Sequence, residues 1–144
     1  MGFGITYDQP FGTGGAVYTY FTRAVLADPG TLMSLTLKVG GSAGQVQVGI
    51  YNDNGSDGPG AKITQSSPVP YSSPGLLTVD IPDQVLTAPV TYWLAVQTNG
   101  PIIYYGSTGT AYRVSNGTFG NLPASGAGFT SWGNGFEISG NYCP

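Results

Sequence analysis

The sequence predicts an all-β protein, folded as an antiparallel two-sheet β-sandwich with a jelly-roll-like order of eight or nine short strands. Stretches that alternate between apolar and polar residues recur along the chain, and clusters of Gly, Pro, Asn and Asp separate them at intervals of roughly 8 to 12 residues. No stretch shows the 3.6-residue period of an amphipathic helix. A closed barrel is the alternative architecture that the same pattern allows.

Three strands are predicted in the first third of the chain. Residues 17–22 are rich in β-branched and aromatic side chains, which favour strands, and a Pro-Gly turn at 27–30 follows them. Residues 33–39 and 46–50 alternate between apolar and polar side chains, so each is expected to place one face on a core and the other in water. The glycine-rich segment 40–44 joins these two strands, which predicts an antiparallel hairpin.

The middle of the chain is predicted to reach the edge of a sheet. Residues 61–65 and 77–81 are expected to be short strands. The segment 66–74 between them contains three prolines, and a central strand excludes them because proline lacks the backbone N–H that the ladder needs. We therefore expect this segment to be an edge strand or a crossing between sheets. Further strands are predicted at 102–105, 111–114 and 136–139.

The longest apolar run, residues 90–97, is predicted to be a central strand that is buried on both faces. Side chains alternate across a strand, so Tyr92, Leu94 and Val96 are expected to face one core. Trp93 is then expected to pack on the opposite face of the sheet.

A single domain fits the length of 144 residues. We divide the chain into a glycine-rich extended arm, residues 1–16, and one β-sandwich domain, residues 17–144. Such an arm either forms an edge strand of its own sheet or pairs with the sheet of a neighbouring copy. For the second case the predicted self-association residues are the large apolar side chains of the arm, which are Phe3, Ile5, Tyr7 and Phe11.

Charged residues are unusually rare in this chain. They make up 8% of it, against about a quarter in an average soluble domain, and the formal net charge is −3. Disorder does not explain the deficit, because 40% of the residues are hydrophobic and the chain holds 10 Tyr, 6 Phe and 2 Trp. A surface of Ser, Thr, Gln, Asn and Gly repels neighbouring copies weakly. We therefore expect copies to pack together in a filament, shell, virus particle or larger secreted chain, at an extracellular or surface-displayed location.

The composition also excludes several classes of function. Without histidine, no Ser–His–Asp or Cys–His site can form, and turns or a polar strand face account for the carboxylates, so no enzymatic activity is expected. Four scattered bases cannot form a nucleic-acid-binding stripe, and no stretch approaches the roughly 18 apolar residues of a membrane span. Cys143 is the single cysteine, so it is either a free terminal thiol or an intermolecular link.

Loop 52–60 concentrates side-chain oxygens, for which there are two explanations. The first is calcium, which prefers oxygen ligands, and calcium is the one cofactor that the chain suggests. The candidate metal ligands are Asp53, Asn54, Ser56 and Asp57. Their spacing does not match an EF-hand loop. The second explanation is turn chemistry, because the Asn-Gly and Asp-Gly pairs in this loop favour positive φ angles.

Aromatic residues between positions 104 and 132 suggest a platform for sugar rings, because the C–H face of a sugar stacks on exposed aromatic rings. The candidate carbohydrate-binding residues are Tyr104, Tyr105, Tyr112, Phe129 and Trp132. Tyr104 and Tyr105 point to opposite faces of one predicted strand, so only one of them can be exposed there. Burial over one end of the sandwich is the alternative for Trp132.

Three motifs together resemble a group of known modules. They are Val48-Gly-Ile-Tyr-Asn-Asp-Asn-Gly with the later Gly58-Pro-Gly, then Leu77-Thr-Val-Asp-Ile, then Thr91-Tyr-Trp-Leu-Ala-Val. The pattern is similar to that of the jelly-roll modules of bacterial and phage surface and secreted proteins, and it covers roughly residues 32–97. The resemblance implies a jelly-roll fold and an accessory extracellular role. No binding residue carries over, because the matching positions are turn and core positions.

Two functional hypotheses follow. The first is a non-enzymatic structural or adhesive module that self-associates or joins a larger surface assembly such as a filament, shell or virion surface. The alternative is a carbohydrate-binding module of a secreted protein, assisted by calcium, with glycans as its partners.

Overall fold

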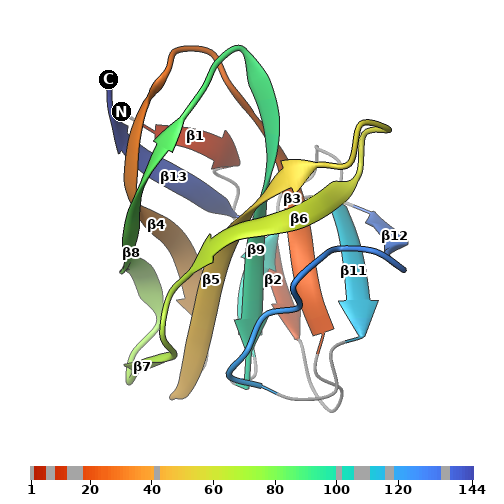
Figure 1. Ribbon diagram of the computed structural model, residues 1–144. Coiled ribbons are helices and arrows are strands. Elements are labelled where there is room, and N and C mark those ends of the chain that lie inside the picture. The colour runs from red at the N-terminus through yellow and green to blue at the C-terminus, as the bar shows by residue number, and fades with distance from the viewer. Residues whose placement is uncertain are drawn as a thin grey trace.

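The computed structural model describes residues 2–5, 9–12, 18–40, 43–99, 102–105, 111–115, 119–133 and 137–144. All regular elements in these ranges are β-strands, and they form two antiparallel sheets that lie face to face (Figure 1). The predicted antiparallel β-sandwich is therefore confirmed, while the jelly-roll connectivity stays a prediction. In the same ranges there is no helix long and apolar enough to cross a membrane.

The first sheet is built around β4 (Gly30–Gly40). One side of β4 pairs with β8 (Gly75–Leu86), and the other side is shared by β13 (Ile138–Cys143) and β10 (Ile102–Tyr105). β1 (Gly2–Ile5) pairs with β13, and β2 (Gln9–Gly12) pairs with β10. Within the described ranges, β8 is thus an edge strand of this sheet.

The second sheet has the strand order β12-β11-β3-β9-β5-β6. Its strands are β12 (Thr130–Gly133), β11 (Ala111–Ser115), β3 (Tyr18–Leu26), β9 (Val90–Thr98), β5 (Gly44–Asp53) and β6 (Pro59–Gln65). β7 (Val69–Tyr71) pairs with the first residues of β5 and continues the edge that β6 begins.

The central strand predicted at 90–97 is confirmed. It is β9, which lies between β3 and β5 in the second sheet. Trp93 and Leu94 are both fully buried, and they belong to separate cores on the two faces of the sheet. The proline-rich segment 66–74 combines the two roles expected of it, because it contains the edge strand β7 and then crosses to β8 in the other sheet.

The described part of the chain contains thirteen strands, more than the eight or nine expected. The additional ones are β1, β2, β7 and β12, which have three or four residues each and contain Gly or Pro, residues that are depleted in strands. An edge strand was one of the two possibilities for the arm and for the proline-rich segment, so only β12 lies where no strand was expected. The last predicted strand, 136–139, begins and ends later, as β13. It extends to Cys143 because Tyr142, like Ile138, packs into the main core.

The main core lies between the two sheets and includes residues of the N-terminal segment. Phe3 of β1 is buried, and its ring meets that of Tyr142 edge to face, with centroids 5.9 Å apart. β1 and β2 both pair with strands of the same chain. Residues 2–5 and 9–12 of the arm therefore form edge strands of their own sheet, which is one of the two possibilities that the sequence left open.

A second, smaller core lies on the outer face of the second sheet. Phe21, Tyr51 and Trp93 point outward from β3, β5 and β9, yet all three are fully buried. The segment 119–129 crosses this face and covers part of it (Figure 1). The Lys62 N–H donates to the carbonyl of Ala124 at 2.9 Å, which attaches the segment to β6.

Leu122 is the apolar anchor of this covering segment. It is fully buried above Gly49, where an added Cβ would lie 2.7 Å from the Leu122 Cδ1. The Lys62 ammonium donates to the Leu122 carbonyl at 3.0 Å, and the Tyr51 hydroxyl donates to the Pro123 carbonyl at 2.5 Å. The sequence shows no period here because these contacts, rather than a regular strand, hold the segment in place.

Candidate functional site

The loop that joins β5 to β6 is held together by the side chain of Asn54. Its Oδ1 accepts hydrogen bonds from the backbone N–H groups of Ser56 at 2.7 Å and of Gly58 at 3.2 Å. The backbone N–H of Asn54 donates to the carbonyl of Gly58 at 2.8 Å. These three bonds close the loop into a compact turn, as its Asn and Gly residues predict.

Two residues of this loop adopt the positive φ angles that the sequence predicts. The angle is 86° at Gly55 and 59° at Asp57. Glycine adopts such angles at no steric cost, and Asp is among the few other residues enriched there. The Gly55 N–H donates to Oδ2 of Asp53 at 2.9 Å, so turn chemistry uses this carboxylate as well.

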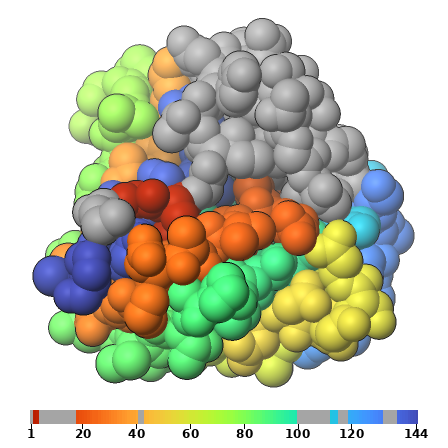
Figure 2. Space-filling model, turned by 90° about the horizontal axis from the view of Figure 1, so that it is seen from above, coloured from red at the N-terminus to blue at the C-terminus, as the bar shows by residue number. Residues whose placement is uncertain are grey.

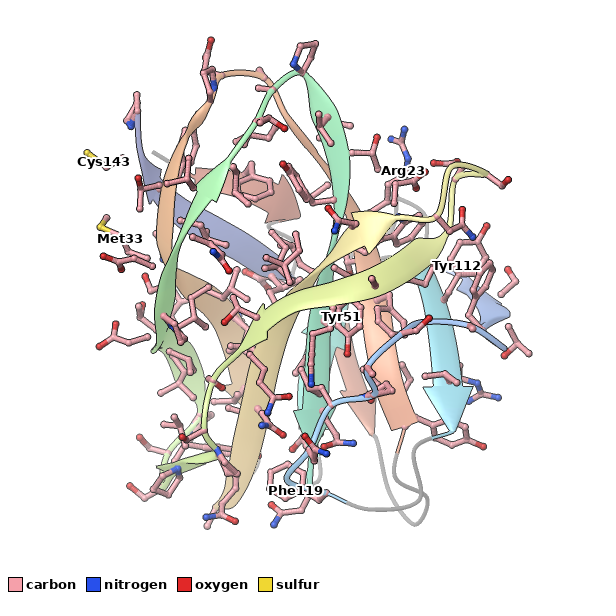
Figure 3. All side chains as sticks on the ribbon, in the orientation of Figure 1. Arg23, Met33, Tyr51, Tyr112, Phe119 and Cys143 are labelled. Atoms are coloured by element: carbon pink, nitrogen blue, oxygen red, sulfur yellow. The ribbon has the colours of Figure 1, made fainter. Side chains whose placement is uncertain are left out.

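Two contacts attach the loop to the second sheet. The indole N–H of Trp93 donates to Oδ1 of Asp53 at 2.9 Å. Arg23 of β3 donates from Nε to Oδ1 of Asp57 at 2.7 Å and from Nη2 to Oγ1 of Thr91 at 3.3 Å. The Arg23 and Asp57 side chains are 36% and 60% exposed, so this ion pair lies at the surface, beside the loop in Figure 3.

Three aromatic rings, each in contact with the next, connect the second, smaller core to this loop. The ring centroids of Trp93 and Tyr112 are 5.2 Å apart, and those of Tyr112 and Phe129 are 4.4 Å apart. Phe129 lies against Gly58, where an added Cβ would be 2.5 Å from its Cζ. Seen from above, loop 52–60 lies at the surface beside residues 119–133 (Figure 2). The structure thus brings two predicted carbohydrate-binding residues, Tyr112 and Phe129, next to the predicted calcium loop.

The other predicted carbohydrate-binding residues lie elsewhere in the fold. Tyr104 and Tyr105 are in β10, so they belong to the first sheet, whereas Tyr112 belongs to the second. Trp132 is in β12, which pairs with β11, the strand of Tyr112. The backbone therefore places Trp132 in the sheet of Tyr112 and separates both from the two tyrosines of β10.

Three of the four predicted calcium ligands already accept hydrogen bonds through side-chain oxygens, whereas the fourth, Ser56, takes part in the loop through its backbone N–H. Asp53 uses both carboxylate oxygens, Asn54 uses Oδ1, and Asp57 accepts from Arg23. A calcium ion at Asp57 would compete with the Arg23 guanidinium for the same oxygen. Among the residues that the structure describes, no three His, Cys, Asp or Glu side chains are grouped as metal ligands. Calcium binding at this loop stays a prediction.

Three of the four predicted self-association residues are carried by strands that pair within the chain. Phe3 is buried in the main core, and Ile5 lies opposite Ile138 in the β1–β13 pair. Phe11 lies opposite Ile103 in the β2–β10 pair, and Tyr7 is outside the described residues. Self-association through these residues stays a prediction.

The outer face of the first sheet carries a row of uncharged polar side chains. Nδ2 of Asn141 donates to Oγ of Ser34 at 3.0 Å and to Oγ1 of Thr36 at 2.9 Å. Thr36 shares a further hydrogen bond of 2.8 Å with Thr78. This row crosses β13, β4 and β8, and its side chains satisfy much of one another's hydrogen-bonding capacity. Met33 and the exposed thiol of Cys143 lie on the same side of the molecule (Figure 3).

The edge of the first sheet at β8 combines exposed apolar side chains with a hollow. Leu76 is 72% exposed and Val85 is 79% exposed. Beside the strand lies a cavity of about 420 Å³, open to solvent, between β8 and the β6–β7 edge of the second sheet. Its apolar lining includes Val69, Val79 and Ile81.

Burial raises the pKa of three tyrosines. The largest shift is at Tyr51, whose hydroxyl donates to the Pro123 carbonyl. Burial also raises the pKa of Tyr71, and it raises the pKa of Tyr20 against the opposing charge of Arg113. These phenols are therefore neutral near pH 7.

Two surfaces of this chain thus combine unusual chemistry. One is the loop end of the second sheet, with its rings and its ion pair, and the other is the β8 side of the first sheet.

No protein-family model matches the sequence, and no curated protein is significantly similar to it.

Proposed function

We propose that this protein is a non-enzymatic structural or adhesive module, displayed outside a cell or on a virus particle, that packs against copies of itself. The observation that supports this proposal is the β8 side of the first sheet. Among the described residues, the two most exposed large apolar side chains are Leu76 and Val85, and both lie on this edge strand. Exposed apolar groups at a sheet edge favour association because an added partner removes them from water.

The polar face beside β8 suits close contact between copies. Ser34, Thr36, Thr78 and Asn141 hydrogen-bond to one another, so covering them leaves fewer polar groups without a partner. With 8% charged residues and a net charge of −3, the copies also repel each other weakly.

The oligomeric state of the full chain in solution tests this proposal. We expect the mass measured by light scattering to rise with concentration from the low micromolar to the millimolar range. Because few charges are involved, added salt should change this association little. A monomer over the whole concentration range would contradict the proposal.

A second candidate function is carbohydrate binding at the loop end of the second sheet. It is favoured by the half-buried rings of Tyr112 and Phe129 beside the exposed Arg23–Asp57 pair. Rings of this kind contact the apolar face of a sugar, while a guanidinium and a carboxylate bond its hydroxyls.

A glycan array tests this second function, with calcium and with a chelator in separate experiments. We expect binding that Phe129→Ala abolishes and that Phe119→Ala retains, because Phe119 is also half-buried but lies at the opposite end of the covering segment (Figure 3). An array without hits in both conditions would exclude glycan recognition. Hits that vanish with the chelator would support calcium at loop 52–60.

A further inference from the structure

We infer that two copies of this chain associate through the free edge of β8, by antiparallel pairing of β8 with β8 of the second copy about a twofold axis at Thr78. This inference rests on the proposed self-association and names its interface. It would join the first sheets of both copies into one continuous sheet.

The first half of β8 is an open template for another strand. It pairs with β4 in an unbroken register from Val39↔Gly75 to Ser34↔Asp80. In the described ranges, no strand pairs with its other side. Alternate N–H and C=O groups on that side therefore lack a ladder partner. Proline and irregular pairing, which hinder strand addition at many sheet edges, occur within β8 only beyond Asp80, at Pro82 and the adjoining register shift.

The hollow beside this edge fits the inward side chains of an added strand. It lies on the core side of β8, and Val69, Val79 and Ile81 make part of its lining apolar. A strand added to β8 would place every second side chain over this hollow. The β8 strand of a second copy offers Leu77 at one of those positions, since this side chain is only partly buried against the core of its own chain.

An axis at Thr78 gives a self-complementary register. Leu77 of each copy then lies opposite Val79 of the other on the inner face. On the outer face, Leu76 of each copy lies opposite Asp80 of the other. Lys38 is the β4 neighbour of Leu76, so each Lys38 shares a cross-strand row with the acidic Asp80 of the other copy. An axis at Asp80 would instead place two carboxylates opposite each other.

The expected association is weak for an isolated pair of molecules. A stable complex buries roughly 800 Å² on each partner, and pairing over the short stretch from Gly75 to Asp80 removes less surface than that. Such an edge contact is suited to a repeated assembly, where many copies are held at high local concentration.

Disulfide trapping in the full chain tests the axis directly. In a Cys143→Ser background, Thr78→Cys should form disulfide-linked dimers under mild oxidation. Directly opposite Cβ atoms in an antiparallel pair are about 4.5–5.5 Å apart, which small shifts bring within disulfide range. Thr130→Cys in the same background is the matched control, because Thr130 is also an exposed threonine on an edge strand. It should give no disulfide-linked dimer.

Charge substitutions test the same register by sedimentation equilibrium. Leu76→Asp places two like charges opposite each other at both ends of the twofold pair, which should weaken association roughly tenfold. Adding Asp80→Lys to this variant should restore association, because opposite charges then face each other. Val25→Asp, at an exposed side chain of β3 in the second sheet, should leave association unchanged. Leu76 and Val25 are both exposed, so these variants should fold normally.

The outcomes separate this inference from the proposed function. If the wild type self-associates but Thr78→Cys gives no dimer and Leu76→Asp has no effect, the β8 interface is wrong and self-association stands. If the wild type is monomeric at every concentration, both are wrong. Equal trapping of Thr78→Cys and Thr130→Cys would also overturn the β8 interface, since it would indicate unspecific collisions.

Discussion

The indole N–H of Trp93 donates a hydrogen bond to Oδ1 of Asp53 at 2.9 Å, which connects the buried centre of the second sheet to its exposed loop. Trp93 is fully buried in the outer core, whereas Asp53 lies at the end of β5. The Arg23–Asp57 pair and the Phe129 ring meet the same loop. The position of the loop is therefore coupled to the centre of the sheet.

Removing the Trp93 donor should destabilise the protein more than changing its acceptor. Trp93→Phe leaves the Asp53 carboxylate without this bond and should lower the free energy of unfolding by about 2–3 kcal/mol. Asp53→Asn keeps an oxygen acceptor for the indole and should lose about 1 kcal/mol. Urea denaturation measures both values. A Trp93→Phe variant as stable as the wild type would show that this bond contributes little.

The close contact between Gly58 and Phe129 predicts a non-additive pair of substitutions. Gly58→Ala would place Cβ 2.5 Å from the Phe129 Cζ, which should lower the free energy of unfolding, by about 1–3 kcal/mol. Phe129→Ala removes the obstacle, so the double variant should lose less than the sum of the single losses. Gly55→Ala is the control, because its Cβ would meet nothing within 4 Å and its cost comes from φ alone. Its loss should add to that of Phe129→Ala.

Stability should fall at alkaline pH partly because of Tyr51. Burial raises the pKa of its phenol in the folded protein, so the unfolded chain loses this proton first. The contribution of Tyr51 is complete below about pH 10 and decreases as the pH rises above that value. Urea denaturation between about pH 8 and pH 11 should give a shallower decline for Tyr51→Phe than for the wild type. Part of the decline should remain in Tyr51→Phe, because burial also raises the pKa of Tyr20 and Tyr71. Identical slopes for the variant and the wild type would contradict the prediction.

Asp57 should tolerate glycine better than alanine. Its ion pair with Arg23 is exposed, and such pairs contribute at most about 1 kcal/mol. Asp57→Gly loses the pair but relieves the positive φ of 59°, so its free energy of unfolding should stay within about 0.5 kcal/mol of the wild type. Asp57→Ala loses the pair and keeps the strain, which should cost about 1 kcal/mol more. Thermal unfolding of the two variants checks that the glycine variant is the more stable one. A more stable alanine variant would contradict the prediction.

Leu122 should control the segment that covers the second sheet. It is fully buried over Gly49, so Leu122→Ala should lower the free energy of unfolding by about 2–4 kcal/mol. Hydrogen exchange should then accelerate at the Lys62 and Gly126 amides, which bond across this segment. Leu76→Ala, at an exposed leucine, should change stability by less than about 0.5 kcal/mol. Unchanged exchange in Leu122→Ala would mean that the segment is anchored elsewhere.

Alternation predicted two of the long strands, an uninterrupted apolar run predicted a third, and the turn residues predicted the tight turn. Residues 33–39, 46–50 and 90–97 lie within β4, β5 and β9, and the positive φ angles occur at the predicted Gly55 and Asp57. β12 was not expected, and β1, β2 and β7 lie in segments where an edge strand was one of two possibilities. All four contain Gly or Pro, which weaken the strand signal, whereas the equally short β10 consists of Ile and Tyr alone and was predicted. One signal for the second core was present, since Phe21, Tyr51 and Trp93 occupy positions that alternate with core residues on the opposite face.

The sequence by itself determined the all-β class, the doubly buried central strand and the chemistry of loop 52–60. These are local properties, because alternation and turn residues act within a few positions of the chain. Only the tertiary structure decided that Phe129 meets this loop, with Tyr112 packed on Phe129, and that the first half of β8 is left open. Those outcomes depend on pairs distant in sequence, such as Arg23 with Asp57 and Tyr51 with Pro123, which are 34 and 72 positions apart. Such pairs form through the joint burial of whole strands, which no local pattern records.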